Sequence, residues 1–206
     1  MARGPGLYLI TPPALEPDAF AETLAATLDA ADIACLRLAL DAPETTIRRA
    51  ADALRPVCAA RDVALVIAED ARLCAEHGLD GVHLGTGAPA RIRAARDAVG
   101  RERSVGAWGG ASRHWGMIAA EAGADYVALG PVAGRAPRDA ANALADLFAW
   151  WAEMIETPAV AEGGLTPDAA RALAPWVDFV APRMSVWTAA DGPAAAVRAY
   201  AAALAG

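Results

Sequence analysis

Two loops late in the chain carry residues that suit an oxyanion. One holds the adjacent glycines Gly163 and Gly164, and the other holds Arg183 and Ser185. Adjacent glycines let the backbone approach a ligand and leave N–H groups free to point at an anion, while Arg and Ser add a charge and a hydroxyl. We expect a phosphate group to bind where these loops converge. The other interpretation is that Gly163 and Gly164 only form a tight turn.

Glu162 directly precedes the glycine pair and bears on the same chemistry. A carboxyl group at this place could act as an acid or a base. Its negative charge would also repel a phosphate group. An anion cradle at these loops therefore requires Glu162 to leave room for an oxyanion.

Charged and titratable residues also lie within or just after apolar stretches. Arg37 must find a partner or a function: facing inward it would meet a ligand, and facing outward it could pair with a helix carboxylate. His83 poses the same question, and a hydrogen-bonded core histidine is the commoner outcome. Glu69 and Asp70 follow a strand, where carboxylates could hold Mg²⁺. Asp70 could instead cap the next helix.

Aromatic residues and a Gly/Pro-rich loop add further candidates. Trp108 ends a predicted strand and could stack on a flat ring. The loop from Gly130 to Arg138 carries two arginines, so it is either a flap over an anionic substrate or a solvated loop. Trp150 and Trp151 are expected to pack in the core or at a contact between copies of the chain in a homo-oligomer.

These candidates need a scaffold, and a repeat in the sequence predicts it. Three segments enter a short apolar strand through an Asp: Leu79–Gly85, Ala124–Gly130 and Val177–Pro182. Predicted strands are Leu7–Thr11, Ile33–Leu38, Val63–Ala68, Gly81–Leu84, Ser104–Ala107, Tyr126–Leu129, Ala159–Ala161 and Phe179–Ala181. Predicted helices are Pro17–Ala31, Pro43–Ala60, Asp70–His77, Pro89–Val99, Ser112–Ala122, Arg138–Glu153, Pro167–Leu173 and Pro193–Leu204.

Eight strands, each followed by a helix, predict an α/β protein with a (β/α)8 TIM barrel as a single domain over residues 1–206. A doubly wound open sheet is the alternative, but it would want a glycine-rich turn after the first strand. Thr11 is followed there by two prolines and an alanine. In a barrel, chemistry lies at the carboxyl ends of the strands, and phosphate often binds after the seventh and eighth.

Composition narrows the function classes. The net charge is −7 without a basic cluster, which argues against nucleic acid as a partner. All 18 cationic residues are Arg, so Schiff-base chemistry on a lysine is excluded. Without a long apolar run or a leader-like N-terminus, we expect a cytoplasmic protein with no membrane partner. The three cysteines are expected to be buried thiols.

The strand sequences together resemble the thiamine phosphate synthase family, which includes a thiazole tautomerase branch. The resemblance covers essentially the whole chain and is carried by Leu7–Thr11, Asp80–Gly85, Gly123–Val132 and Ala161–Leu165. It implies a (β/α)8 barrel. It also implies a transferase that joins a pyrimidine pyrophosphate to a thiazole phosphate with Mg²⁺, releasing pyrophosphate. The protein would neutralise the leaving group and hold the partners in line.

The resemblance is uneven across the expected site. Gly163, Gly164 and Ser185 match the thiazole-phosphate side. On the pyrophosphate side, the family's Gln-x-Arg-x-Lys keeps only Arg37, its metal-binding Asp is replaced by Glu69, and a cation of the sixth loop remains as Arg138. The family's second metal-binding Asp has no counterpart in the Gly85–Pro89 loop, and Trp108 stands at the family's serine.

Three hypotheses follow. The first is a thiamine-pathway enzyme of this family, either a divergent synthase or an enzyme that acts on a related phosphorylated heterocycle. The second is a non-catalytic relative that binds a phosphorylated ligand as a sensor or partner protein. The third is a different barrel enzyme that reuses the phosphate end. Losing several charge-neutralising groups should cost much of the transition-state stabilisation. We expect the phosphate-bearing ligand to bind and the Mg²⁺-dependent synthase reaction to be very weak.

Overall fold

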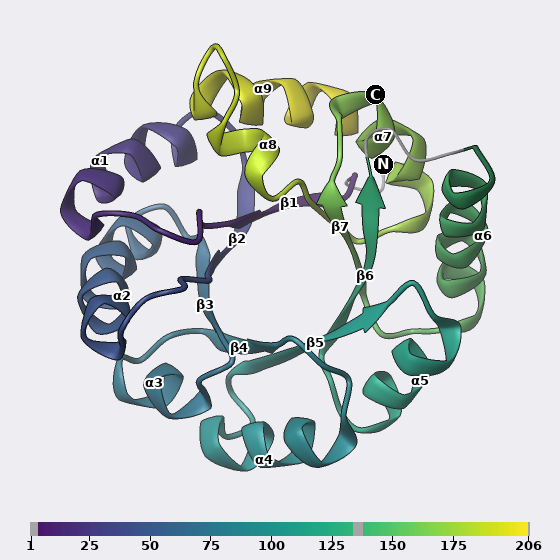
Figure 1. The fold of residues 1–206 in the computed structure, drawn as a ribbon, viewed down its shortest axis with the longest axis horizontal. Coiled ribbons are helices and arrows are strands. Elements are labelled where there is room, and N and C mark those ends of the chain that lie inside the picture. Colours follow the sequence, from purple (N-terminus) through teal and green to yellow (C-terminus); the bar gives the residue numbers. More distant parts are fainter. Residues whose placement is uncertain (1–3, 134–137, 206) are drawn as a thin grey trace.

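The protein folds into a closed barrel of eight parallel strands in sequence order, surrounded by a ring of helices (Figure 1). The computed structural model describes residues 4–133 and 138–205, without the side chains of 133 and 138–142. The strands are β1 (Gly6–Ile10), β2 (Ile33–Leu38), β3 (Ala64–Ala68), β4 (Gly81–Leu84), β5 (Ser104–Gly110), β6 (Tyr126–Ala133), β7 (Ala159–Gly164) and β8 (Phe179–Ala181). Because β8 pairs with β1, the barrel prediction is confirmed and the open sheet is excluded.

The helices lie outside the barrel and bury one face each against it. They are α1 (Pro17–Leu28), α2 (Glu44–Ala59), α3 (Ala71–Glu76), α4 (Pro89–Val99), α5 (Arg113–Glu121), α6 (Arg138–Met154), α7 (Pro167–Leu173), α8 (Met184–Trp187) and α9 (Pro193–Leu204). Asp70, Ser112 and Thr166 cap α3, α5 and α7 by accepting a backbone N–H with their side chains. The sequence did not predict the four-residue helix α8.

The repeated Asp residues tie β4, β6 and β8 each to the preceding strand at the amino end of the barrel. Asp178 donates its N–H to the Ala159 carbonyl, and its carboxylate accepts the Ala159 N–H at 2.8 Å. The same reciprocal pair joins Asp125 to Val105 on β5, and Asp80 to Leu65 on β3. The repeat is therefore a structural device, because each carboxylate satisfies a strand N–H at the edge of the ladder.

Strands β5, β6 and β7 run further than their sequence predicts. The predicted ends at Ala107, Leu129 and Ala161 fall before Gly or Pro residues, which usually interrupt strands. In the barrel β6 and β7 continue side by side, with Val132 opposite Gly163. A Cβ at Gly163 would overlap the Val132 carbonyl, so glycine here permits close approach of two strands.

The core holds most of the apolar side chains, including residues whose role the sequence left open. Cys35, Cys58 and Cys74 are free and buried, as expected, and burial raises the pKa of the Cys35 thiol to about 12. Trp151 is buried and donates its indole N–H to the Thr157 carbonyl at 2.8 Å. Trp150 is only partly buried and packs under the Arg113 guanidinium. Within the described ranges, no helix has the length and apolarity to cross a membrane.

Candidate active site

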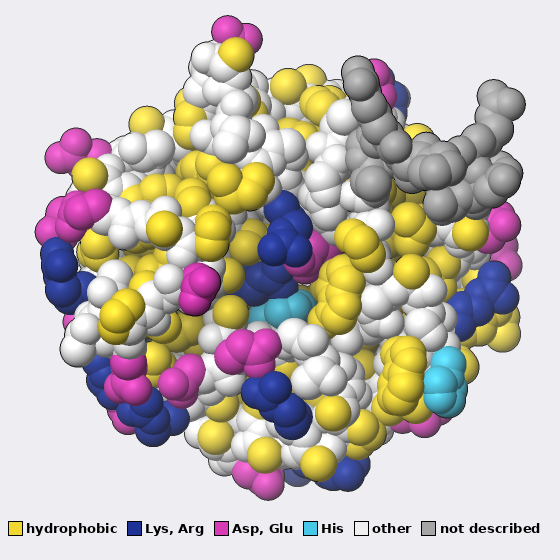
Figure 2. Space-filling view, viewed as in Figure 1, with side chains coloured by type: hydrophobic (Ala, Val, Ile, Leu, Met, Phe, Trp, Pro, Cys, Tyr) yellow, Lys and Arg dark blue, Asp and Glu magenta, His cyan; other side chains and the backbone are white. Residues whose placement is uncertain are grey.

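A cavity of about 300 Å³ opens at the carboxyl ends of the strands. Figure 2 shows this hollow near the centre of the molecule, with histidine and arginine side chains in it and acidic side chains beside them. The lining residues come from seven different strand ends: Ile10, Arg37, Ala39, Ala68, Glu69, His83, Gly85, Trp108, Glu162 and Arg183. This is the end of a barrel at which enzymes of this fold carry their chemistry.

Arg37 and Glu162 form a buried ion pair at the base of this cavity. The Arg37 Nη2 atom lies 2.8 Å from Glu162 Oε2, and the two residues are 5% and 3% exposed. Arg37 thus faces inward, where its expected partner was a ligand, and the partner in the structure is a carboxylate of the protein. The guanidinium also lies over the Tyr8 ring, 5.6 Å from its centroid.

Arg183 reaches the same carboxylate from the other side. Its Nη1 atom lies 3.4 Å from Glu162 Oε1, and its side chain is 56% exposed. Its backbone has a positive φ of 39°, a conformation that non-glycine residues rarely adopt and that clusters at functional sites. The Arg37, Glu162 and Arg183 side chains form one network, which we call the arginine–carboxylate cluster.

His83 is fixed by a chain of buried hydroxyl groups. Its Nδ1 atom lies 3.2 Å from the Tyr126 hydroxyl, which lies 2.8 Å from the Tyr8 hydroxyl. The expectation of a hydrogen-bonded core histidine is confirmed, although His83 also lines the cavity. Burial, helped by the charge of Arg37, lowers the pKa of His83 well below its ordinary value, so the imidazole is neutral at pH 7.

The two tyrosines are functional-site neighbours that the sequence did not point to. They lie on β1 and β6 and project into the barrel interior among residues of the other strands. A Cβ at Gly106 would overlap the Tyr126 ring, so the glycine makes room for it. The sequence does hold one signal for these hydroxyl groups. Tyr126 is an isolated tyrosine in an apolar strand, and it lies opposite a glycine of the paired strand.

The carboxylates at this rim already have partners. Glu69 accepts the Gly85 N–H at 2.7 Å with one oxygen and pairs with Arg91 at 2.9 Å through the other. Asp70 caps α3, which confirms the helix-cap interpretation. Among the residues that the structure describes, no three His, Cys, Asp or Glu side chains come together as metal ligands. The carboxylate of Glu69 is thus engaged within the protein through both of its oxygens.

The predicted phosphate loops have a different geometry from a preformed cradle. The Ser185 hydroxyl lies 3.1 Å from the Leu165 carbonyl and also contacts the Pro182 carbonyl, so it is engaged within the protein. Gly163 is buried in the pairing with β6, whereas Gly164 is exposed with open space beside it. Of this predicted set, Gly164 presents the accessible backbone.

Of the remaining candidates, only Trp108 is among the described residues that line the cavity. It is half-buried. A Cβ at Gly130 would overlap the Glu162 carbonyl, so this glycine, like Gly163, lies where β6 and β7 approach closely. Arg138 begins α6, but its side chain is outside the described residues. The predicted flap includes residues 134–137, which are also outside the described part.

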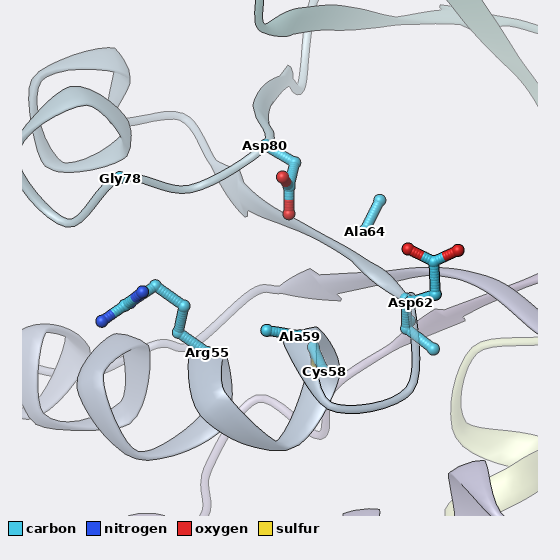
Figure 3. A pocket seen from close by; sticks show the side chains of 8 residues that line it. Arg55, Cys58, Ala59, Asp62, Ala64, Gly78 and Asp80 are labelled. Atoms are coloured by element: carbon cyan, nitrogen blue, oxygen red, sulfur yellow. The ribbon is translucent and has the colours of Figure 1, made fainter.

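A second cavity, of about 450 Å³, opens at the opposite end of the barrel. Figure 3 shows its lining residues from α2 and the segments leading into β3 and β4, with Asp62 and Asp80 among them. The carboxylate of Asp80 holds the Leu65 N–H. Residues at this end of a barrel serve stability, so we place the candidate active site at the carboxyl ends of the strands.

The closed barrel of parallel strands and the cavity at their carboxyl ends place the protein in the class of (β/α)8 barrels. The thiamine monophosphate synthase family model matches residues 7–186. The chain is 47% identical over 196 residues to a thiamine-phosphate synthase of Rhodospirillum centenum, covering 93% of each chain. It is 42% identical over 159 residues to that of Erythrobacter litoralis, covering 74% of this chain and 72% of the relative.

A solved structure supports the same grouping. The thiamine phosphate pyrophosphorylase of Pyrococcus furiosus superposes with a TM-score of 0.77 at 25% identity, over 97% of this chain and 95% of the other. The protein belongs to the thiamine phosphate synthase family, a family of thiamine biosynthesis.

Proposed function

We propose that the protein binds a phosphorylated heterocycle, thiazole phosphate or a close chemical relative, in the cavity at the carboxyl ends of the strands. The observation that carries the proposal is the lining of that cavity, where Trp108 offers a face for a flat ring and Arg183 offers a partly exposed cation. Gly164 is exposed at the end of β7, beside the strand that leads to Arg183. Membership of the family supports thiazole phosphate over other heterocycles.

We also propose that the Mg²⁺-dependent joining of a pyrimidine pyrophosphate to this ligand is very weak. A pyrophosphate leaving group needs several positive charges, and Arg37 is already neutralised by Glu162. Glu69, where the resemblance implies a Mg²⁺ ligand, is held by Arg91 and the Gly85 amide. A Mg²⁺ ion at Glu69 would have to share its oxygens with these two partners. These contacts favour the second candidate function, a non-catalytic relative that binds the phosphorylated heterocycle.

Thermal unfolding with thiazole phosphate tests the binding proposal. A ligand at ten times its Kd stabilises the folded state by about 1.4 kcal/mol, which raises Tm by about 3–6 °C in a domain of this size. The thiazole alcohol without its phosphate is the matched control and should give a much smaller shift. No change in Tm at millimolar thiazole phosphate would contradict the proposal.

A two-substrate assay separates the candidate functions. Thiamine phosphate formation from the pyrimidine pyrophosphate and thiazole phosphate is followed with and without millimolar Mg²⁺. We expect negligible turnover and no rescue of a strain that lacks thiamine phosphate synthase. Robust Mg²⁺-dependent turnover would instead establish a synthase that neutralises pyrophosphate with groups other than the expected ones. The proposal includes a cytoplasmic location and leaves open assembly as a homo-oligomer.

A further inference from the structure

The two arginines of the arginine–carboxylate cluster hold Glu162 very differently. The Arg37–Glu162 contact is short and both side chains are buried. Removing one partner of such a pair leaves an uncompensated buried charge, so the pair stays together when a ligand enters. Arg37 therefore keeps its contacts with Glu162 and with the Tyr8 ring.

Arg183 is the exchangeable member of the cluster. Its contact with Glu162 is 0.6 Å longer than that of Arg37 (3.4 against 2.8 Å), and more than half of its side chain is exposed. Only the arginine end of this pair is exposed, and Glu162 keeps the buried Arg37 as its nearer partner. The guanidinium of Arg183 can therefore turn to another anion without leaving Glu162 unpaired. It lines the cavity, directly after β8.

We propose that Arg183 is the phosphoryl-binding arm of this cavity and that Glu162 competes with the ligand for it. A phosphoryl group that enters the cavity takes Arg183 from Glu162, while Glu162 keeps Arg37. The resident carboxylate lowers the affinity for oxyanions in two ways, by occupying Arg183 and by repelling the incoming charge. The proposal concerns only the binding of the oxyanion. It does not depend on which heterocycle carries the phosphoryl group.

Binding of inorganic pyrophosphate, measured by calorimetry at low ionic strength, tests this with the full chain. Arg183→Gln should weaken binding about tenfold, the loss expected for one charge-assisted contact. Arg91→Gln removes an equally exposed arginine that pairs with Glu69 on the same rim, and it should change binding less than about twofold. Equal binding by the Arg183→Gln variant and the wild type would overturn the proposal.

The competition is tested by removing Glu162. Glu162→Gln should bind pyrophosphate about three- to fivefold more tightly than the wild type, because the variant releases Arg183 and removes a negative charge that repels the ligand. The double variant Arg37→Met with Glu162→Gln removes the whole buried pair, a change that stability often tolerates. It leaves Arg183 as the freed arginine and should show the same gain.

Three outcomes would overturn the competition between Glu162 and the ligand. The first is that both Glu162 variants bind no better than the wild type. The second is that they bind less well, which would make Glu162 part of the ligand site. The third is an equal gain in Glu69→Gln, a variant that removes another carboxylate lining the cavity. That result would mean that the tighter binding comes from the loss of a negative charge at the rim and not from the release of Arg183.

Discussion

The contacts of the repeated Asp residues predict how much stability is lost when one of them is replaced. Asp178 gives the simplest test. Asp125 also pairs with Arg96, so its substitution would remove two interactions. In Asp178→Ala the Ala159 N–H loses the carboxylate that it contacts at 2.8 Å, at a residue that is fully buried. An unsatisfied buried N–H costs about 1–3 kcal/mol. For a chain of this length, that lowers Tm by about 2–12 °C.

The assay is thermal unfolding followed by circular dichroism, with two comparison variants. Asp178→Asn keeps an oxygen that can accept the Ala159 N–H. Its loss of stability should therefore be half that of Asp178→Ala or less. Asp97→Ala removes an exposed carboxylate on α4 and should stay within about 0.5 kcal/mol of the wild type. Pyrophosphate binding should be unchanged in Asp178→Ala, because Asp178 lies at the opposite end of the barrel from the cavity.

Equal unfolding temperatures of Asp178→Ala and Asp97→Ala would contradict this prediction. The carboxylate would then contribute nothing beyond the backbone pairing of Asp178 with Ala159. A loss of pyrophosphate affinity in Asp178→Ala would also contradict it, since it would couple the amino end of the barrel to the site.

Two further predictions concern the site itself. Gly163→Ala should destabilise the fold by about 1–3 kcal/mol because its Cβ would overlap the Val132 carbonyl, whereas Gly164→Ala has open space and should be near neutral by thermal unfolding. The pKa of His83 is lowered in the folded state, so below about pH 6.5 the unfolded chain binds a proton that the folded chain does not. Wild-type stability in urea should therefore fall as pH drops below 6.5, by up to about 1.4 kcal/mol per pH unit, and His83→Gln should fall less steeply.

Each of these has a contrary result. Equal stability of Gly163→Ala and Gly164→Ala would show that β6 can move away from β7 without cost. Parallel pH profiles for the wild type and His83→Gln would show that the imidazole takes up a proton within the folded barrel.

Much of the scaffold could be predicted because its determinants are local. The strand Gly81–Leu84 and the helices from Pro89, Pro167 and Pro193 have the bounds that their sequences predict. Apolar runs, a proline in the first turn and capping side chains act within a few residues. The ends of β5, β6 and β7 were predicted too early, because the pairing that extends them lies in a neighbouring strand.

The site was harder to predict, since its geometry depends on which strands become neighbours. The sequence left open whether Arg37 and His83 face the mouth of the barrel, and the partners expected for Arg37 were a ligand or a helix carboxylate. The register brings β2 and β7 to face each other across the interior, and the Arg37–Glu162 pair results. Likewise Ser185 has the right residue type for a phosphate loop, yet α8 turns its hydroxyl toward the Leu165 carbonyl.

The arginine content of the chain connects the stability of the site to its function. An arginine side chain stays protonated at any physiological pH, so one that is buried at the base of an open cavity needs an anion at all times. A lysine could lose its proton in the same place, but the chain has none. Glu162 is the partner of this buried arginine, which is only 5% exposed. The same carboxylate engages Arg37, and the proposed weakness of the synthase reaction rests on this contact, because a guanidinium that is paired with Glu162 is not free for a pyrophosphate group.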